Sequence, residues 1–154
     1  MYIDLPQKKH NLMDEIKIIS KSNDKYLSSV LWELEKEIFE DASWTEKNLE
    51  DHLLNHTGIL YIYNEKIIAY LLYLDGIESN ELLRIGVLPN YRNKGFALTL
   101  IQTLINQNKS IFLEVRRDNF SGIRLYEKIG FKMIGKRKKY YNDGMDGIVY
   151  LLEI

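Results

Sequence analysis

The sequence has 154 residues, of which 45% are hydrophobic and 28% charged, and its formal net charge is -1 at pH 7. This length fits one domain with its own core, and the near-zero charge excludes a strong positive field for non-specific nucleic-acid binding. Because the chain has no cysteine, disulfides, a cysteine nucleophile and thiolate metal ligands are excluded. No apolar run approaches the roughly 20 residues of a membrane span, and the start lacks the apolar core of a signal peptide. We therefore expect a cytoplasmic protein without a membrane partner.

The first half of the chain predicts a strand, two helices and a hairpin. Residues 15–20 alternate in character and predict a strand, and leucines at helical spacing predict a helix over residues 25–40. Ser43 followed three residues later by Glu46 matches a capping box, so a second helix is expected to begin there. Two β-rich runs within residues 58–76 are joined by a short turn and predict an antiparallel hairpin.

The second half predicts alternating strands and helices. A strand over residues 81–88 is followed by a helix and then by a strand over residues 110–116. A short helix follows, with Asn119 or Ser121 as its cap, and the run to residue 154 predicts two closing strands around the turn NDGMDG.

This order of elements predicts an α/β fold. The strand, helix and strand over about residues 81–116 form a βαβ unit with parallel strands, within a mixed, mostly antiparallel sheet that has helices on both faces. Residues 1–14 read as a polar N-terminal arm, and residues 15–154 as a single domain.

The stretch YRNKGFALTL places Arg92, Lys94 and Gly95 directly before a helix. Cations oppose the helix dipole at that end, so a basic turn there indicates an anionic ligand. A glycine lets the backbone approach a ligand, and the free N–H groups of a first helical turn bind anions. We expect this turn to bind a phosphate or pyrophosphate. The alternative is that it is a basic turn exposed to solvent with no ligand.

Several motifs together resemble the GNAT acetyltransferases. LRIGVLPNYRNKGFA is similar to their acyl-CoA signature R/Q-x-x-G-x-G/A, carried here by Arg92, Gly95 and Ala97. FLEVRRDNFSGIRLYEKIGF resembles the next block of RimI-type N-terminal acetyltransferases, and SWTEKNL and KKYYNDGMDGIVYLL are also RimI-like. The resemblance covers about residues 15–154 and implies the GNAT fold.

The resemblance implies acetyl-CoA as the acetyl donor and no metal. Gly86 departs from the alanine more usual in RimI-like strands, and a glycine there suits a bulge. The backbone N–H near Val87 is implied as the oxyanion donor, and Asn119 either contacts the cofactor or only caps its helix. The implied cofactor-binding residues are Ile85, Gly86, Val87, Arg92, Asn93, Lys94, Gly95, Phe96, Ala97, Asn119 and Tyr126.

Amide formation from a thioester requires a base for the amine and an acid for the leaving thiolate. Glu114 matches the glutamate that has the first role in RimI-like enzymes, and Tyr126 matches the tyrosine with the second. The alternative for Glu114 is a strand glutamate paired with Arg116 or a lysine. The alternative for Tyr126 is a helix tyrosine whose ring packs against the sheet.

The acceptor is expected between the loop after the first helix and the last hairpin turn. The implied substrate-binding residues are Glu40, Asp41, Trp44, Tyr140 and Tyr141. The acidic pair would attract a basic residue of the acceptor, and the tyrosines would hold its backbone. A polar loop and a cluster of packed aromatic rings are the alternative.

The resemblance favours an N-acetyltransferase acting on a protein N-terminus, with the N-terminal alanine of a small-subunit ribosomal protein as the implied target. A lysine, a small-molecule amine and a silent acyl-CoA sensor stay open. His52 and His56 are four residues apart, but no third metal ligand accompanies them. We expect no direct nucleic-acid binding, and a monomer or weak homodimer.

Overall fold

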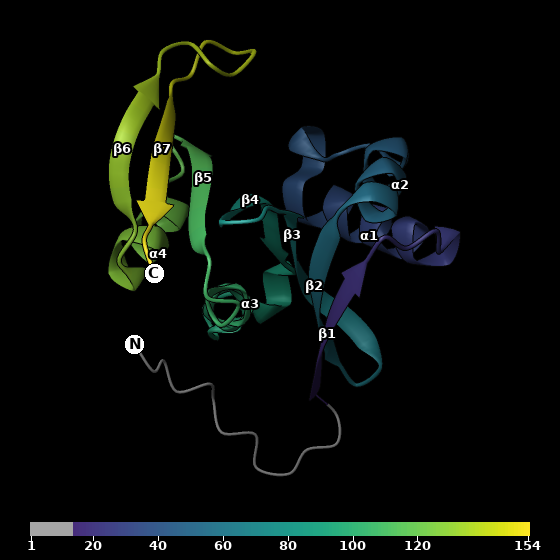
Figure 1. The fold of residues 1–154 in the computed structure, drawn as a ribbon. Coiled ribbons are helices and arrows are strands. Elements are labelled where there is room, and N and C mark those ends of the chain that lie inside the picture. Colours follow the sequence, from purple (N-terminus) through teal and green to yellow (C-terminus); the bar gives the residue numbers. More distant parts are fainter. Residues whose placement is uncertain (1–13) are drawn as a thin grey trace. The chain divides into compact units, whose positions relative to one another are not determined.

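The computed structural model describes residues 14–154 (Figure 1). Its strands are β1 (Asp14–Ser20), β2 (Thr57–Tyr63), β3 (Lys66–Asp75), β4 (Ser79–Val87), β5 (Ser110–Arg116), β6 (Lys132–Arg137) and β7 (Gly147–Leu152). Its α-helices are α1 (Lys25–Phe39), α2 (Glu46–Asn55), α3 (Phe96–Ile105) and α4 (Phe120–Ile129), and short 3₁₀ turns lie at Glu40–Ala42 and Pro89–Tyr91. The predicted N-terminal arm, residues 1–14, falls almost entirely outside the described residues.

The strands form one hydrogen-bonded sheet in the order β1-β2-β3-β4-β5-β7-β6. Strands β4 and β5 pair in parallel, from Ser79 opposite Ser110 to Leu82 opposite Leu113. The β1–β2, β2–β3, β5–β7 and β6–β7 pairs are antiparallel. The predicted α/β fold with a mixed, mostly antiparallel sheet and a βαβ unit is therefore confirmed.

The described chain forms two compact units that share β4. The first unit runs up to Tyr73 and resumes at Arg84–Leu104, and the second comprises Leu74–Leu83 and Ile105–Ile154. The division falls inside β4, so this strand contributes its first residues to one unit and its last residues to the other.

The first unit is held together by α1 and α2 packed on β2 and β3. Its core is a leucine-rich cluster with one tyrosine, comprising Leu31, Leu34, Leu49, Leu53, Leu60, Tyr70 and Leu72. Burying each of these large side chains contributes about 1.5–3 kcal/mol. The helical spacing that predicted α1 is the same spacing that places Leu31 and Leu34 on its inner face.

In the second unit, α4 is joined to β7 by a hydrogen bond from the Tyr150 hydroxyl to Glu127 Oε1 at 2.8 Å. Along β5, Ile111, Leu113 and Val115 are buried, while the alternate residues point to the opposite face. The ring of Tyr126 on α4 meets that of Phe131 with 5.7 Å between their centroids. Alternation along β5 therefore fixes which face carries Glu114.

The capping prediction for the second helix was wrong. Helix α2 begins at Glu46 with Thr45 as its N-cap, and the capping box joins Thr45 to Asn48. Ser43 lies two residues before that cap and ends the preceding 3₁₀ turn, where its N–H donates to the carbonyl of Glu40. In α4, by contrast, the Asn119 side chain caps the helix by accepting from Gly122 N–H, as one of the two predicted caps.

The closing hairpin has a longer turn than the sequence pattern predicted. Strand β6 ends at Arg137 and β7 begins at Gly147. Tyr140 and Tyr141 therefore lie in the turn, which includes Gly144 at φ +85°. No helix in residues 14–154 is both long enough and apolar enough to cross a membrane.

Candidate functional site

The turn before α3 has the backbone geometry of an anion site. Among the helices of residues 14–154, α1, α2 and α4 have side-chain N-caps from Asp24, Thr45 and Asn119. Helix α3 is preceded instead by Gly95, which has no side chain to donate or accept. Gly95 has φ +86°, and a Cβ added to it would meet no atom within 4 Å. The first N–H groups of α3 are therefore open to an external acceptor.

Two predicted cofactor side chains have partners within the protein. Arg92 donates from Nε to the Val87 carbonyl at 3.2 Å and from Nη2 to the Ile38 carbonyl at 3.4 Å. The ring of Phe96 meets the buried ring of Tyr61 edge-on, with 4.7 Å between centroids. Arg92 thus fastens the turn to β4 and to the last turn of α1, and Phe96 anchors the start of α3.

Lys94 and Asn93 lie on the exposed side of the same turn. Lys94 is exposed, with its Nζ 5.9 Å from the centroid of the Tyr91 ring. Asn93 takes a positive φ of 60°, which asparagine tolerates better than most residues. Lys94 is therefore the cation of this turn that stays available to a ligand.

Gly86 on β4 has a packing reason to be glycine. An added Cβ would lie 3.1 Å from Ile38 Cδ1 and 3.1 Å from Phe39 Cε2, so a side chain would push against the end of α1. The close approach between β4 and α1 is therefore a reason for glycine at this position.

The predicted acceptor loop follows α1 directly. Glu40 and Asp41 are exposed and form no ion pair within residues 14–154, and Trp44 is half-buried. Glu40 has φ 51° and ψ -118°, an uncommon conformation for a residue with a side chain. The loop therefore presents two free carboxylates from a constrained backbone.

A buried ion pair that sequence reasoning missed holds this loop. Glu35 is fully buried and pairs with Arg84, with 2.8 Å between Oε2 and Nη2. Burial, and then the hydrogen bond to Glu35, raises the pKa of the Tyr70 hydroxyl well above its usual range. The available signal was a charged residue inside each of two apolar patterns, ELLRIGV and the inner face of the first helix.

Glu114 lies within a cluster of charged and aromatic side chains in the second unit. Its Oε1 is 2.5 Å from the Nε of Arg137, and its side chain is 17% exposed. The carboxylate also raises the pKa of Tyr140 through a hydrogen bond. On β4, burial and then the charge of Glu114 raise the pKa of Glu81. Glu114 is therefore a charged hydrogen-bond acceptor on a partly exposed face.

The pairing of the last strands explains how Arg137 reaches Glu114. On β7, Gly147 lies opposite Arg137 and Val149 lies opposite Glu114, so both partners extend over the same face. Gly147 leaves that face without a side chain, and a Cβ there would lie 3.3 Å from the Tyr140 ring. Glycine at this position therefore makes room for the cluster.

The alternative for Glu114 was an ion pair with Arg116 or a lysine; Glu114 does form an ion pair, but its partner is Arg137 and not Arg116. The Arg116 guanidinium contacts Asp118 at 3.1 Å and Asp143 at 2.6 Å. The contact with Arg116 is the main cause that holds the pKa of Asp143 below its usual value. The Arg116 guanidinium also lies 4.9 Å from the Tyr141 ring centroid. Arg116 thus ties the hairpin turn, with Tyr141, to the end of β5.

Tyr126 is almost completely buried, with 5% of its surface exposed. Burial, and to a smaller extent Tyr141, raises its pKa to about 12. Its hydroxyl forms no hydrogen bond within the described part of the chain. The ring of Tyr126 is therefore packed in the interior of the second unit, and its hydroxyl stays protonated at neutral pH and able to donate.

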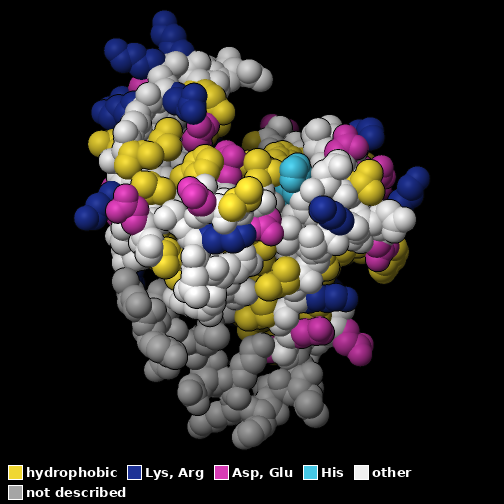
Figure 2. Space-filling model, viewed as in Figure 1, with side chains coloured by type: hydrophobic (Ala, Val, Ile, Leu, Met, Phe, Trp, Pro, Cys, Tyr) yellow, Lys and Arg dark blue, Asp and Glu magenta, His cyan; other side chains and the backbone are white. Residues whose placement is uncertain are grey.

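The β6–β7 hairpin carries a concentration of positive charge (Figure 2). Lys136, Arg137, Lys138 and Lys139 are consecutive and all exposed. Only Arg137 among these four pairs with a carboxylate in residues 14–154. The hairpin beside Glu114 is therefore basic.

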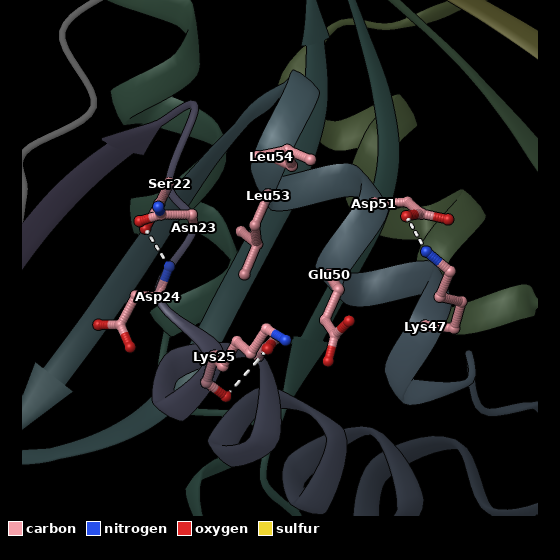
Figure 3. A pocket seen from close by; sticks show the side chains of 10 residues that line it. Ser22, Asn23, Asp24, Lys25, Lys47, Glu50, Asp51, Leu53 and Leu54 are labelled. Atoms are coloured by element: carbon pink, nitrogen blue, oxygen red, sulfur yellow. Dashed lines mark hydrogen bonds and ion pairs between the residues drawn. The ribbon is translucent and has the colours of Figure 1, made fainter.

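A shallow pocket of about 120 Å³ lies between the start of α1 and α2 (Figure 3). One wall carries the ion pair between Lys47 and Asp51. The pocket contains none of the predicted site residues; its lining residues are Ser22, Asn23, Asp24, Lys25, Ser28, Lys47, Glu50, Asp51, Leu53 and Leu54.

The paired histidines have a packing role. His52 is buried, and its Nε2–H donates to the Thr57 carbonyl at 2.9 Å. Its ring lies 5.2 Å from that of His56 and 5.9 Å from that of Trp44. Residues 14–154 contain no group of three or more side chains that could hold a metal ion.

The predicted residues thus fall into two groups, one in each compact unit. The first unit brings Arg92 to Val87 and presents Glu40, Asp41 and the turn before α3. The second unit brings Glu114 to Tyr140.

Comparisons with known proteins connect these features to a family. The sequence profile of the acetyltransferase (GNAT) family matches residues 25–131. An N-alpha-acetyltransferase of Saccharolobus solfataricus is 40% identical over 76 residues, which cover 46% of this chain and 46% of that protein, about half its length. The ribosomal protein bS18-alanine N-acetyltransferase of Escherichia coli K12 is 31% identical over 120 residues, covering 72% of this chain and 81% of that protein.

The fold has a corresponding solved structure. The ribosomal-protein-S18-alanine N-acetyltransferase from Escherichia coli superposes with a TM-score of 0.80 at 25% sequence identity, covering 91% of this chain and 93% of that one.

Proposed function

Because this chain belongs to the GNAT family of acetyltransferases, we propose that it transfers an acetyl group from acetyl-CoA to a protein N-terminal amine. Family membership confirms the enzyme class that the motifs predicted. The names of the archaeal and bacterial relatives support a terminal amine as acceptor. The finer proposal is the N-terminal alanine of a ribosomal protein, which implies a cytoplasmic location.

The residues present fit acetyl-CoA as the donor. The turn before α3 has an open glycine and no side-chain cap, which suits the pyrophosphate of coenzyme A. The backbone N–H groups of Gly95, Phe96 and Ala97, together with Lys94, would hold that group. When bound, acetyl-CoA supplies an activated acetyl group as a thioester.

The observation that carries the catalytic proposal is the environment of Glu114. Its carboxylate is partly exposed and lies among Arg137, Tyr140 and the carboxyl of Glu81. We assign Glu114 as the base that takes the proton from the amine as its nitrogen bonds to the acetyl carbon. Tyr126 gives its proton to the sulfur as the carbon–sulfur bond breaks, and its raised pKa keeps that proton available.

Charge supports the acceptor proposal. Glu40 and Asp41 are exposed carboxylates without an ion-pair partner in residues 14–154, and they would attract a basic residue early in the acceptor. Trp44, Tyr140 and Tyr141 would contact the peptide backbone through their rings and polar groups.

Mass spectrometry with two peptides tests the proposal. One peptide has a free N-terminal alanine followed by basic residues, and the other is the same peptide with a blocked N-terminus and added lysines. Acetylation of the free-alanine peptide alone is the expected result. Acetylation of the blocked peptide would move the acceptor to lysine side chains. No product from either, with acetyl-CoA bound, would contradict the peptide proposal and leave a small-molecule amine or a cofactor sensor.

A further inference from the structure

The ion pair between Glu35 and Arg84 lies at the centre of a network of hydrogen bonds. Both carboxylate oxygens of Glu35 accept from Arg84, from Nε at 3.0 Å and from Nη2 at 2.8 Å. The Tyr70 hydroxyl adds a third bond at 2.6 Å. Glu35 has no exposed side-chain surface, and Arg84 has 17%. A buried ion pair contributes little net stability compared with apolar side chains of the same size. This pair is therefore expected to have a role beyond stabilising the core.

Both members of the pair also form hydrogen bonds with the backbone of the loop that follows α1. Arg84 Nη2 donates to the Ala42 carbonyl at 2.6 Å, and Glu35 Oε2 accepts from the Trp44 N–H at 2.8 Å. The Arg84 guanidinium stacks 3.6 Å from the centroid of the Phe39 ring. The pair therefore contacts the backbone on both sides of Ser43, and the ring of the residue just before Glu40.

The conformation of the loop depends on such contacts. Glu40 has φ 51° and ψ -118°, which a residue with a side chain adopts only when its surroundings enforce it. Two local backbone hydrogen bonds contribute, from Glu40 N–H to the Lys36 carbonyl and from Ser43 N–H to the Glu40 carbonyl. The remaining polar backbone contacts described above come from Glu35 and Arg84.

We propose that Arg84 and Glu35 are positioning residues for the acceptor: their ion pair fixes the backbone of residues 40–44 so that Glu40 and Asp41 face the incoming amine-bearing chain. This inference rests on the proposed function, because that function makes residues 40–44 the acceptor side. The pair does not touch the reacting atoms. It acts through the loop, so it governs acceptor binding and not donor binding.

Two variants separate this role from simple stability. Arg84→Lys keeps a cation beside Glu35 but loses the guanidinium fork that reaches both Glu35 and Ala42. The double variant Glu35→Gln with Arg84→Met removes both buried charges together, so no unpaired charge is left in the core. Lys36→Gln is the matched control, because it breaks the exposed ion pair with Glu33 on the same helix.

The readouts are the acceptor KM, kcat, the acetyl-CoA Kd and amide hydrogen exchange in residues 40–44. Both test variants should raise the KM for the free-alanine peptide about tenfold, as expected for losing a hydrogen bond to a charged group. They should also exchange the Trp44 amide faster, with the acetyl-CoA Kd within about twofold of wild type. Lys36→Gln should match wild type in all four.

A lowered melting temperature with unchanged KM and unchanged exchange would overturn the inference, since the pair would then serve stability alone. A weakened acetyl-CoA Kd equal to the change in KM would overturn it as well. Failure of the wild type to acetylate either peptide would refute the proposed function. Hydrogen exchange in residues 40–44 would still decide whether the pair holds the loop.

Discussion

Glu114 and Arg137 meet across strand β7, with 2.5 Å between the carboxylate Oε1 and the guanidinium Nε. The Arg137 side chain is 55% exposed, and ion pairs with such exposure contribute little net stability. On the proposed role of Glu114 as the base, an acceptor amine would replace Arg137 at the carboxylate with little loss of stability. The ion pair holds the Glu114 carboxylate in a defined orientation.

Replacing Glu114 by glutamine should lower kcat by about 10²- to 10⁴-fold if the carboxylate is the base. The acetyl-CoA Kd should stay at its wild-type value, because Glu114 is proposed to take a proton and the turn before α3 is proposed to hold the cofactor. Steady-state kinetics and calorimetric titration measure the two quantities. Arg137→Gln is the companion variant: it removes the ion-pair partner but leaves the base, and should keep kcat within about tenfold. Full activity in Glu114→Gln would reject the assignment.

Replacing Tyr126 by phenylalanine should lower kcat and leave the ring packing against Phe131 intact. Because the pKa of Tyr126 is about 12, its hydroxyl stays protonated through ordinary assay conditions. The acid should therefore give the wild-type pH–rate profile no alkaline fall below about pH 11. A fall near pH 10 that disappears in Tyr126→Phe would contradict the raised pKa, and a wild-type rate in the variant would remove the acid role.

Gly95 and Gly144 offer a matched pair for testing the cofactor turn. They have φ +86° and +85°, and a Cβ added to either meets nothing within 4 Å. Valine at either position should cost similar backbone strain, about 1–2 kcal/mol. Only Gly95→Val should weaken acetyl-CoA binding, by about tenfold or more. Equal acetyl-CoA affinities in the two variants would exclude the turn before α3 from the cofactor site.

Reversing the charges of Glu40 and Asp41 to lysine should raise the KM for a basic acceptor peptide. Because both side chains are exposed, the fold should be unaffected, and added salt should narrow the difference from wild type. Steady-state kinetics at low and high ionic strength provide the measurement. An unchanged KM for the basic peptide would contradict the proposal that these two residues bind the acceptor.

His52 predicts a loss of stability in mild acid. Burial lowers its pKa, so below about pH 6.5, the usual value of a free histidine, the unfolded chain binds the proton more readily than the folded one. Stability is therefore greatest above that pH and is lost as the pH falls toward the lowered pKa. Urea unfolding between pH 5 and 8 should show this slope in wild type and a weaker one in His52→Gln. Identical slopes would show that another group controls the acid response.

Local patterns in the sequence were sufficient for much of the fold. The apolar spacing of α1 and the alternation along β5 reflect the periods of helix and strand, and these periods persist whatever the partner elements are. Asn119 and Gly130 mark the ends of α4 because capping is a short-range interaction.

The partners of the site residues could not be predicted in the same way. Arg137 meets Glu114 because strand register brings them to one face, and Arg84 on β4 meets Glu35 because α1 packs closely on that strand. Register depends on long-range pairing, and a sequence pattern shows only which faces residues occupy. For the same reason the sequence indicated Arg116 or a lysine as the partner of Glu114, although the Arg116 guanidinium bonds Asp118 and Asp143 instead.

Strand β4 restricts how this protein can change by insertion or deletion. At Arg84 and Gly86 the strand faces α1 and the loop after it. Glu81 is at an odd-numbered position, and the charge of Glu114 contributes to raising its pKa. Adding or removing one residue within the strand would turn every later side chain to the opposite face. An insertion or deletion before Arg84 would therefore break its hydrogen bonds to Glu35 and Ala42, and one before Gly86 would place a different residue against Ile38 and Phe39. Length variation is therefore confined to the flanking loops, while β4 itself can vary only by substitution.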